Sequence, residues 1–140
     1  MKKLSCNLLL TCDQTILSKD NKISLIGIFD QIFLPEIPGS HSKLSLVGII
    51  SGEPFSDQIL TITLKDPKNQ SVYPDQNLSV NLGTTGKSNL VAEFINLPIK
   101  YFGTYVFSLY VGKILLGSTT LTASQISQSS SFSPKSKVIN

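Results

Sequence analysis

A segment near the middle of the chain has residue types and spacing that could bind a nucleotide. Residues 81–88 read Asn-Leu-Gly-Thr-Thr-Gly-Lys-Ser and resemble the loop G-x-x-x-x-G-K-[ST], with Asn in place of the first glycine. In such loops backbone N–H groups surround phosphate oxygens, so Gly86, Lys87 and Ser88 would be the cofactor-binding residues. The loop must open a long helix, yet Pro98 follows closely. We expect a surface turn and keep a small nucleotide-binding protein as one alternative.

Cysteine and histidine are too few for the common nucleophilic and metal sites. Cys6 and Cys12 fall in one predicted strand, where their Cα atoms would lie about 20 Å apart. A disulfide needs less than about 7 Å, so we expect two free, buried thiols. The single histidine, His41, follows a Pro-Gly break and is expected in a surface loop. We therefore predict no catalytic residue, no metal, no cofactor and no enzymatic activity.

Three aromatic residues in or beside predicted turns are candidates for a contact surface: Tyr73, Tyr101 and Phe102. Tyrosine is common at recognition surfaces. Packing against a core explains each of them singly as well. A small-ligand or carbohydrate-binding function is therefore a second alternative.

The elements that must position these residues are strands. In residues 57–66, Leu60, Ile62 and Leu64 alternate with polar residues, the period of a half-buried strand. Residues 22–34 are apolar on both faces, which is typical of a central or doubly covered strand. Turn signals follow at short intervals, as in sandwiches and barrels. We predict an all-β protein: a single antiparallel β-sandwich, Ig-like or C2-like, of about seven to nine strands.

Length and composition indicate one domain. A chain of 140 residues fits a single core. We expect residues 1–123 to form the sandwich. Seven of the 17 residues in 124–140 are serine, so we expect a flexible, disordered Ser-rich C-terminal tail there.

Charge argues against nucleic acid and membrane as partners. All 12 basic residues are lysines, and four of them lie near the chain ends. The other eight are outnumbered by the nine Asp and Glu residues, so the body of the chain has no excess of positive charge. Arginine, the favoured reader of bases, is absent from the sequence. A stretch of 18 apolar residues, the length of a membrane span, is also absent. Free thiols favour a reducing compartment, so we expect a cytoplasmic protein.

Several motifs resemble a bacterial family of small proteins without assigned function. In that family a strand ends in Cys-Asp, and a hairpin with Gly or Asp and Lys leads into Ser-Leu-Ile-Gly-Ile-Tyr. A Pro-x-x-Pro break and a Pro-Gly-x-Tyr-x-Phe strand opening follow. The corresponding segments here are residues 12–13, 20–22, 24–29, 35–38 and 102–107, with Phe in place of the last motif's Pro. The resemblance covers about residues 5–123. It implies a β-sandwich and transfers no catalytic residue.

The function that these observations favour is a non-enzymatic protein-binding or assembly module. A surface rich in Ser, Thr and Asn suits contact with a protein partner or self-association. Long apolar strand edges would also support self-pairing.

Overall fold

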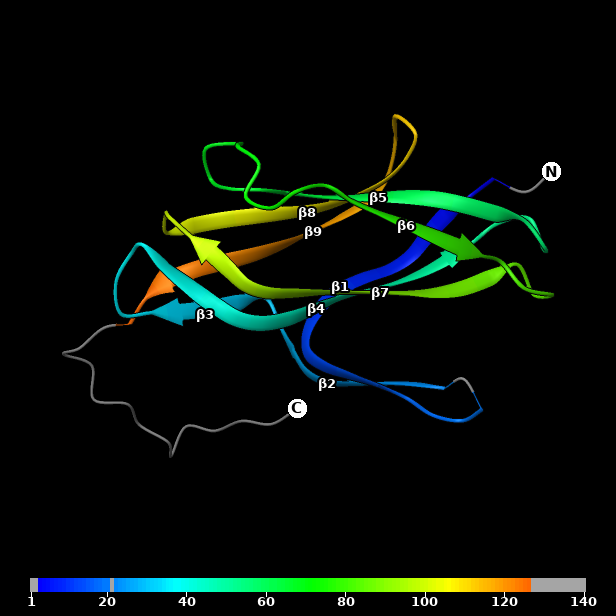
Figure 1. Cartoon of the computed structure of the whole chain (residues 1–140), viewed down its shortest axis with the longest axis horizontal. Coiled ribbons are helices and arrows are strands. Elements are labelled where there is room, and N and C mark those ends of the chain that lie inside the picture. Colours follow the sequence, from blue (N-terminus) through cyan, green and yellow to red (C-terminus); the bar gives the residue numbers. More distant parts are fainter. Residues whose placement is uncertain (1–2, 21, 127–140) are drawn as a thin grey trace.

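A computed structural model describes residues 3–20 and 22–126, which form two β-sheets (Figure 1). The first sheet has the order β2 (Ile23–Phe29), β1 (Ser5–Leu17), β4 (Gly39–Ser51), β7 (Lys87–Ile99). The second has the order β3 (Gln31–Leu34), β9 (Ile114–Gln125), β8 (Gly103–Val111), β5 (Asp57–Lys65), β6 (Gln76–Asn81). The pairing is antiparallel except between β3 and β9. Nine strands in two sheets confirm the predicted all-β sandwich.

Helices are absent from residues 3–20 and 22–126. In that part of the chain, therefore, we find no helix with the length and apolar character of a membrane span.

The connections between the strands follow an immunoglobulin-like pattern. From β4 onward, the chain changes sheets between β4 and β5, returns between β6 and β7, and changes again between β7 and β8. The Tyr105 hydroxyl, near the start of β8, donates to the Tyr101 carbonyl at 2.8 Å and accepts from the Tyr101 N–H at 3.3 Å. This is the tyrosine corner of immunoglobulin-like sandwiches, in which a tyrosine fixes the turn that leads into its own strand.

Alternating side chains of the two sheets build the core. Leu60, Ile62 and Leu64 of β5 are buried as predicted, and the residues between them are only partly buried. At the centre, the Phe94 ring lies 5.2 Å from those of Tyr73 and Phe107. Inward-facing residues of both sheets thus share one apolar cluster.

Two of the turns between strands form for local reasons. The Asp66 carboxylate accepts from the N–H groups of Lys68 and Gln70 at 2.8 and 2.9 Å, which closes the turn after β5. Gly112 has a φ of +57° in the two-residue hairpin between Val111 and Ile114.

Residues 22–34 do not form one covered strand, so that prediction was wrong. β2 and β3 divide them between the two sheets, and each lies at a sheet edge. Ile26 and Ile28 of β2 are 47% and 62% exposed. An apolar sequence predicts burial, but only the strand order decides whether a neighbour covers the strand.

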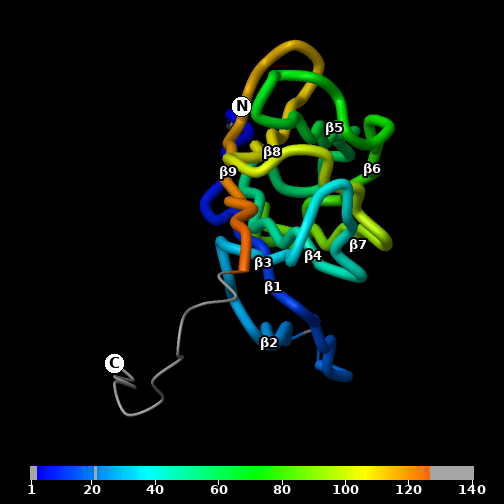
Figure 2. Tube along the Cα trace, turned by 90° about the vertical axis from the view of Figure 1, so that its left-hand side faces the viewer, coloured from blue at the N-terminus to red at the C-terminus, as the bar shows by residue number. Residues whose placement is uncertain are grey.

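The β1–β2 hairpin extends beyond the sheet. β1 pairs with β4 only as far as Cys12, and Gln14–Leu17 then pair with Ile23–Ile26 alone among the described residues. We call residues 14–26 the β1–β2 arm. Both views show it projecting from the side of β4 and β7, away from the sheet of β5, β6 and β8 (Figures 1 and 2).

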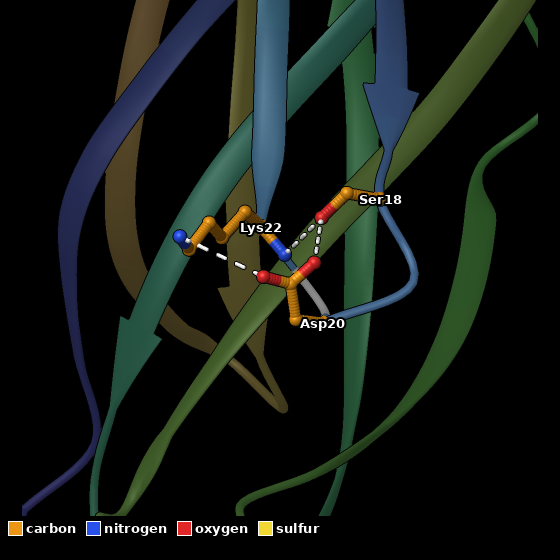
Figure 3. Close-up of polar contacts among 3 residues, drawn as sticks. All are labelled: Ser18, Asp20 and Lys22. Atoms are coloured by element: carbon orange, nitrogen blue, oxygen red, sulfur yellow. Dashed lines mark hydrogen bonds and ion pairs between the residues drawn. The ribbon is translucent and has the colours of Figure 1, made fainter.

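A polar cluster closes the tip of the arm (Figure 3). The Ser18 hydroxyl donates to Asp20 at 3.0 Å and accepts from the Lys22 N–H at 3.1 Å. The Lys22 ammonium lies 3.6 Å from the Asp20 carboxylate. These groups are exposed, so they shape the turn and contribute little to global stability.

The last strand continues past the predicted domain boundary. β9 ends at Gln125, and the Ile126 N–H donates to the Leu34 carbonyl at 2.9 Å. The remainder of the predicted tail, residues 127–140, lies outside the described residues.

Candidate functional site

The phosphate-loop-like segment is a turn between β6 and β7. The Gly86 N–H donates to the Gly83 carbonyl at 3.0 Å, and the Gly52 N–H donates to the Gly86 carbonyl at 2.8 Å. A Cβ at Gly86 would collide with the Gly52 carbonyl oxygen, so this glycine permits a close backbone approach. Lys87 and Ser88 begin a strand, and the loop lacks the helix N-terminus that binds phosphate in nucleotide-binding loops.

The three aromatic candidates do not converge on one pocket among those of the described residues. Tyr73 is half-buried edge-on against Phe94, and Phe102 packs against the core. Tyr101 lies under the Lys68 ammonium, 4.4 Å from the ring centre, and lines a cavity of about 140 Å³. Ligand pockets typically measure about 300–1,000 Å³. The role of Tyr73, Tyr101 and Phe102 as a contact surface stays a prediction.

Tyr105 lines the same small cavity and gives a testable pH dependence. Burial raises the pKa of its hydroxyl above the ordinary value near 10. Its stabilising effect is therefore complete below about pH 10 and is lost as the pH rises through the raised pKa. We expect Tyr105→Phe to lower the free energy of unfolding by about 1–3 kcal/mol at neutral pH, because both Tyr101 backbone groups lose their partner. Urea unfolding at about pH 7 and about pH 11 measures this. Between these pH values the free energy of unfolding should fall less in the variant than in the unchanged protein. An equal fall in both proteins would contradict the stabilising role of the Tyr105 hydroxyl.

The cysteines and the histidine do not form a nucleophilic pair. Cys6 and Cys12 both lie in β1 and are free, as predicted, but of the two only Cys12 is buried and Cys6 is half-buried. His41 lies in β4, half-buried, with its ring centre 5.7 Å from that of Phe29. The expected surface-loop position was wrong because β4 begins at Gly39, directly after the proline break.

Both thiols should react slowly in the folded protein. Burial raises the pKa of Cys6 and of Cys12, and Cys12 is fully buried, so little thiolate is present or accessible at neutral pH. We expect Cys12 to react with a disulfide reagent at least about tenfold more slowly than free cysteine at about pH 8. Labelling with and without urea, followed by mass spectrometry, measures this. Rapid labelling of Cys12 without urea would contradict it.

A pocket of about 420 Å³ lies at the base of the β1–β2 arm, between β2, β3 and the start of β4. We call it the arm-base pocket. Asp13, Gln31 and His41 supply its polar groups. Phe29 and Phe33 supply aromatic surface.

Sequence reasoning missed the arm-base pocket, with one partial signal. That signal is Gly27, since a glycine inside an apolar strand often marks a close backbone approach, and it has a φ of +71° beside Asp13. The convergence of Asp13, Gln31 and His41 depends on pairing between strands distant in sequence, which composition does not show.

Comparison with solved structures shows the fold. A β-glucosidase from Erythrobacter marinus aligns with 87% of this chain at a TM-score of 0.54 and 9% identity, and the chain spans 15% of it. A DNA-bound alkylpurine DNA glycosylase from Pseudomonas fluorescens aligns with 86% at 0.50 and 13% identity, over 30% of its length. An immunoglobulin-like protein from Pseudomonas aeruginosa aligns with 86% at 0.49 and 14% identity, over 96% of its length.

A family model matches the chain, whereas no single curated protein does. The search of curated proteins gave no match. A model described as a family of unknown function matches residues 7–124, which include all strands from β2 to β8 and most of β1 and β9. This agrees with the expected family without assigned function, and the chain belongs to the family of unknown function DUF6941.

Proposed function

We propose that this protein is a non-enzymatic binding or assembly module whose β1–β2 arm contacts a protein partner. The observation that carries the proposal is that the arm has apolar side chains on both faces. By register and alternation, Ile16 and Ile26 share one face, and Leu17 and Ile23 share the other. Ile16 is 47% exposed and Leu17 66% exposed. A partner that covers them would remove this apolar surface from water.

The backbone of the arm supports the same proposal. β2 is an edge strand, and among the described strands it pairs only with β1. An isolated two-stranded hairpin is marginally stable in water. A strand from a partner added to the free edge of β2 would complete its hydrogen bonds and order the arm.

Two observations support a non-enzymatic role. Burial raises the pKa of both thiols, which makes them poor nucleophiles. The turn at Gly86–Lys87–Ser88 leads into a strand and not into a helix. Two free thiols support a reducing compartment, the cytoplasm, as the place in which the protein acts.

Site-specific photo-crosslinking in the native cells tests the proposal. A photoreactive residue at Leu17 samples the arm, and one at Thr120, an exposed position on β9, samples the opposite sheet. We expect protein adducts from position 17 in at least about tenfold higher yield, as for a specific contact of 1.4 kcal/mol or more. Mass spectrometry then separates a second copy from another protein. Equal yields at the two positions would overturn the proposal.

A further inference from the structure

The charge on the lining of the arm-base pocket is negative. Asp13 is the one charged side chain among the described residues that line it. The carboxylate is held against the β2 backbone at Gly27, where a Cβ would collide with it. Gly27 has a φ of +71°, a conformation that a larger residue adopts at a cost. The chain thus leaves room for a carboxylate on the pocket wall.

Gln31 adds a hydrogen-bond acceptor to the pocket, beside the Asp13 carboxylate. The Gln31 side-chain nitrogen donates to the Ser124 hydroxyl at 3.0 Å. The side-chain oxygen of Gln31 is then the atom that can accept a hydrogen bond from a ligand. His41 Nε2 is buried without a hydrogen-bond partner among the described residues. This nitrogen is shielded from the pocket, so the groups open to a ligand are the Asp13 carboxylate and the Gln31 side-chain oxygen, both on exposed residues.

Aromatic rings complete the pocket. Phe33 is 58% exposed, and Phe29 packs against His41. Ring faces attract organic cations, and a carboxylate adds a charge-assisted hydrogen bond. An anion would be repelled by Asp13, and a neutral apolar group would desolvate the carboxylate without compensation.

The walls of the pocket are fixed to the body of the sandwich. The Thr11 hydroxyl donates to the Phe29 carbonyl at 2.6 Å. The Thr122 N–H donates to the Asp30 carbonyl at 2.9 Å, which ties the β2–β3 link to β9. A site on such supports is preformed, so less ordering is needed when a ligand binds.

We propose that the arm-base pocket binds the guanidinium or ammonium group of an Arg or Lys side chain. In its choice of a protein side chain as the source, this inference rests on the proposed function, since the pocket adjoins the arm. The partner that covers the arm places a basic residue between Asp13 and the aromatic rings of Phe29 and Phe33. The volume of about 420 Å³ lies in the range of ligand pockets.

Titration of the full chain with N-acetyl-arginine amide, followed by NMR, tests the chemistry. We expect shifts at the amides of Asp13, Gly27 and His41 with a dissociation constant of about 1 mM, the scale of a few polar contacts. N-acetyl-citrulline amide, a neutral isostere, should bind at least about tenfold more weakly. Equal binding of the two compounds would overturn the proposal. Tighter binding of putrescine than of N-acetyl-arginine amide would overturn the assignment to a protein side chain.

Asp13→Asn isolates the charge. The carboxylate is exposed and the change is nearly isosteric, so the spectrum of the folded protein should persist while arginine amide binding falls at least about tenfold. Asp75→Asn, at an exposed turn position outside the pocket, is the matched control and should bind as the unchanged protein does. Retained binding in Asp13→Asn would contradict the proposal.

Combining the two assays separates this inference from the proposed function. Arginine amide binding without adducts at position 17 would leave the pocket in place and remove the arm as a docking surface. Adducts at position 17 that are undiminished in Asp13→Asn would leave the arm and remove the pocket as its recognition site.

Discussion

Phe94→Ala is expected to destabilise the protein by about 3–5 kcal/mol, a large part of the roughly 5–15 kcal/mol that typically stabilises a folded domain. Phe94 is 1% exposed and packs at 5.2 Å against the rings of both Tyr73 and Phe107. Its removal leaves a cavity between the sheets and breaks two aromatic contacts, each worth about 0.5–1.5 kcal/mol beyond its buried area. Urea unfolding monitored by circular dichroism measures the loss.

Phe55→Ala is the matched control for that experiment. Phe55 is 73% exposed, and its φ of +62° is retained by either residue, so backbone strain changes little. We expect a loss within about 0.5 kcal/mol, typical of surface positions. Similar losses at positions 55 and 94 would mean that the ring cluster is not the centre of the core.

Deletion of residues 14–26 is expected to abolish partner contact while the sandwich still folds. The deletion joins Asp13 to Gly27 and places an Asp-Gly pair between Cys12 and Ile28, which are already cross-strand partners. Asp-Gly is a favoured two-residue hairpin loop that needs positive φ, and Gly27 already has it. Within residues 3–20 and 22–126, the deleted strand residues pair only with each other, so the free energy of unfolding should change by less than about 1 kcal/mol.

The readout is crosslinking from a photoreactive residue at Ile28, 62% exposed at the base of the arm. Adducts that form in the full-length chain should fall at least about tenfold after the deletion. The double variant Leu17→Ser, Ile26→Ser keeps the arm but removes apolar surface from each face, and it should lose adducts to a similar extent. Undiminished adducts in a folded deletion variant would show that the partner contacts another surface.

The fold was predictable because the signals that define it are local. Alternation in β5 assigns Leu64 to the core, and the Asp-Pro turn after it is closed by the Asp66 side chain. The apolar residues within 89–97 fit a helix or a strand equally well, and β7 is a strand through its full pairing with β4. Propensity left that choice open, and long-range hydrogen bonds decided it.

The candidate site was less predictable than the fold. The sequence shows an apolar run at residues 23–29, and burial between neighbours was the natural expectation. Pairing of β1 with β4 ends at Cys12, so the strand beyond has β2 as its one neighbour among the described strands. Exposure of Ile26 and Ile28 is thus a property of strand order.

By itself, the sequence determined the class of fold, the positions of the turns and the free state of Cys6 and Cys12. Each of these depends on side-chain alternation or on distances within one strand. Tertiary structure alone decided that residues 14–26 project as an arm and that Asp13 and His41 line one pocket. The physical reason is that pairing between distant strands sets which apolar residues are covered and which polar groups meet, and that pairing is a property of the whole chain.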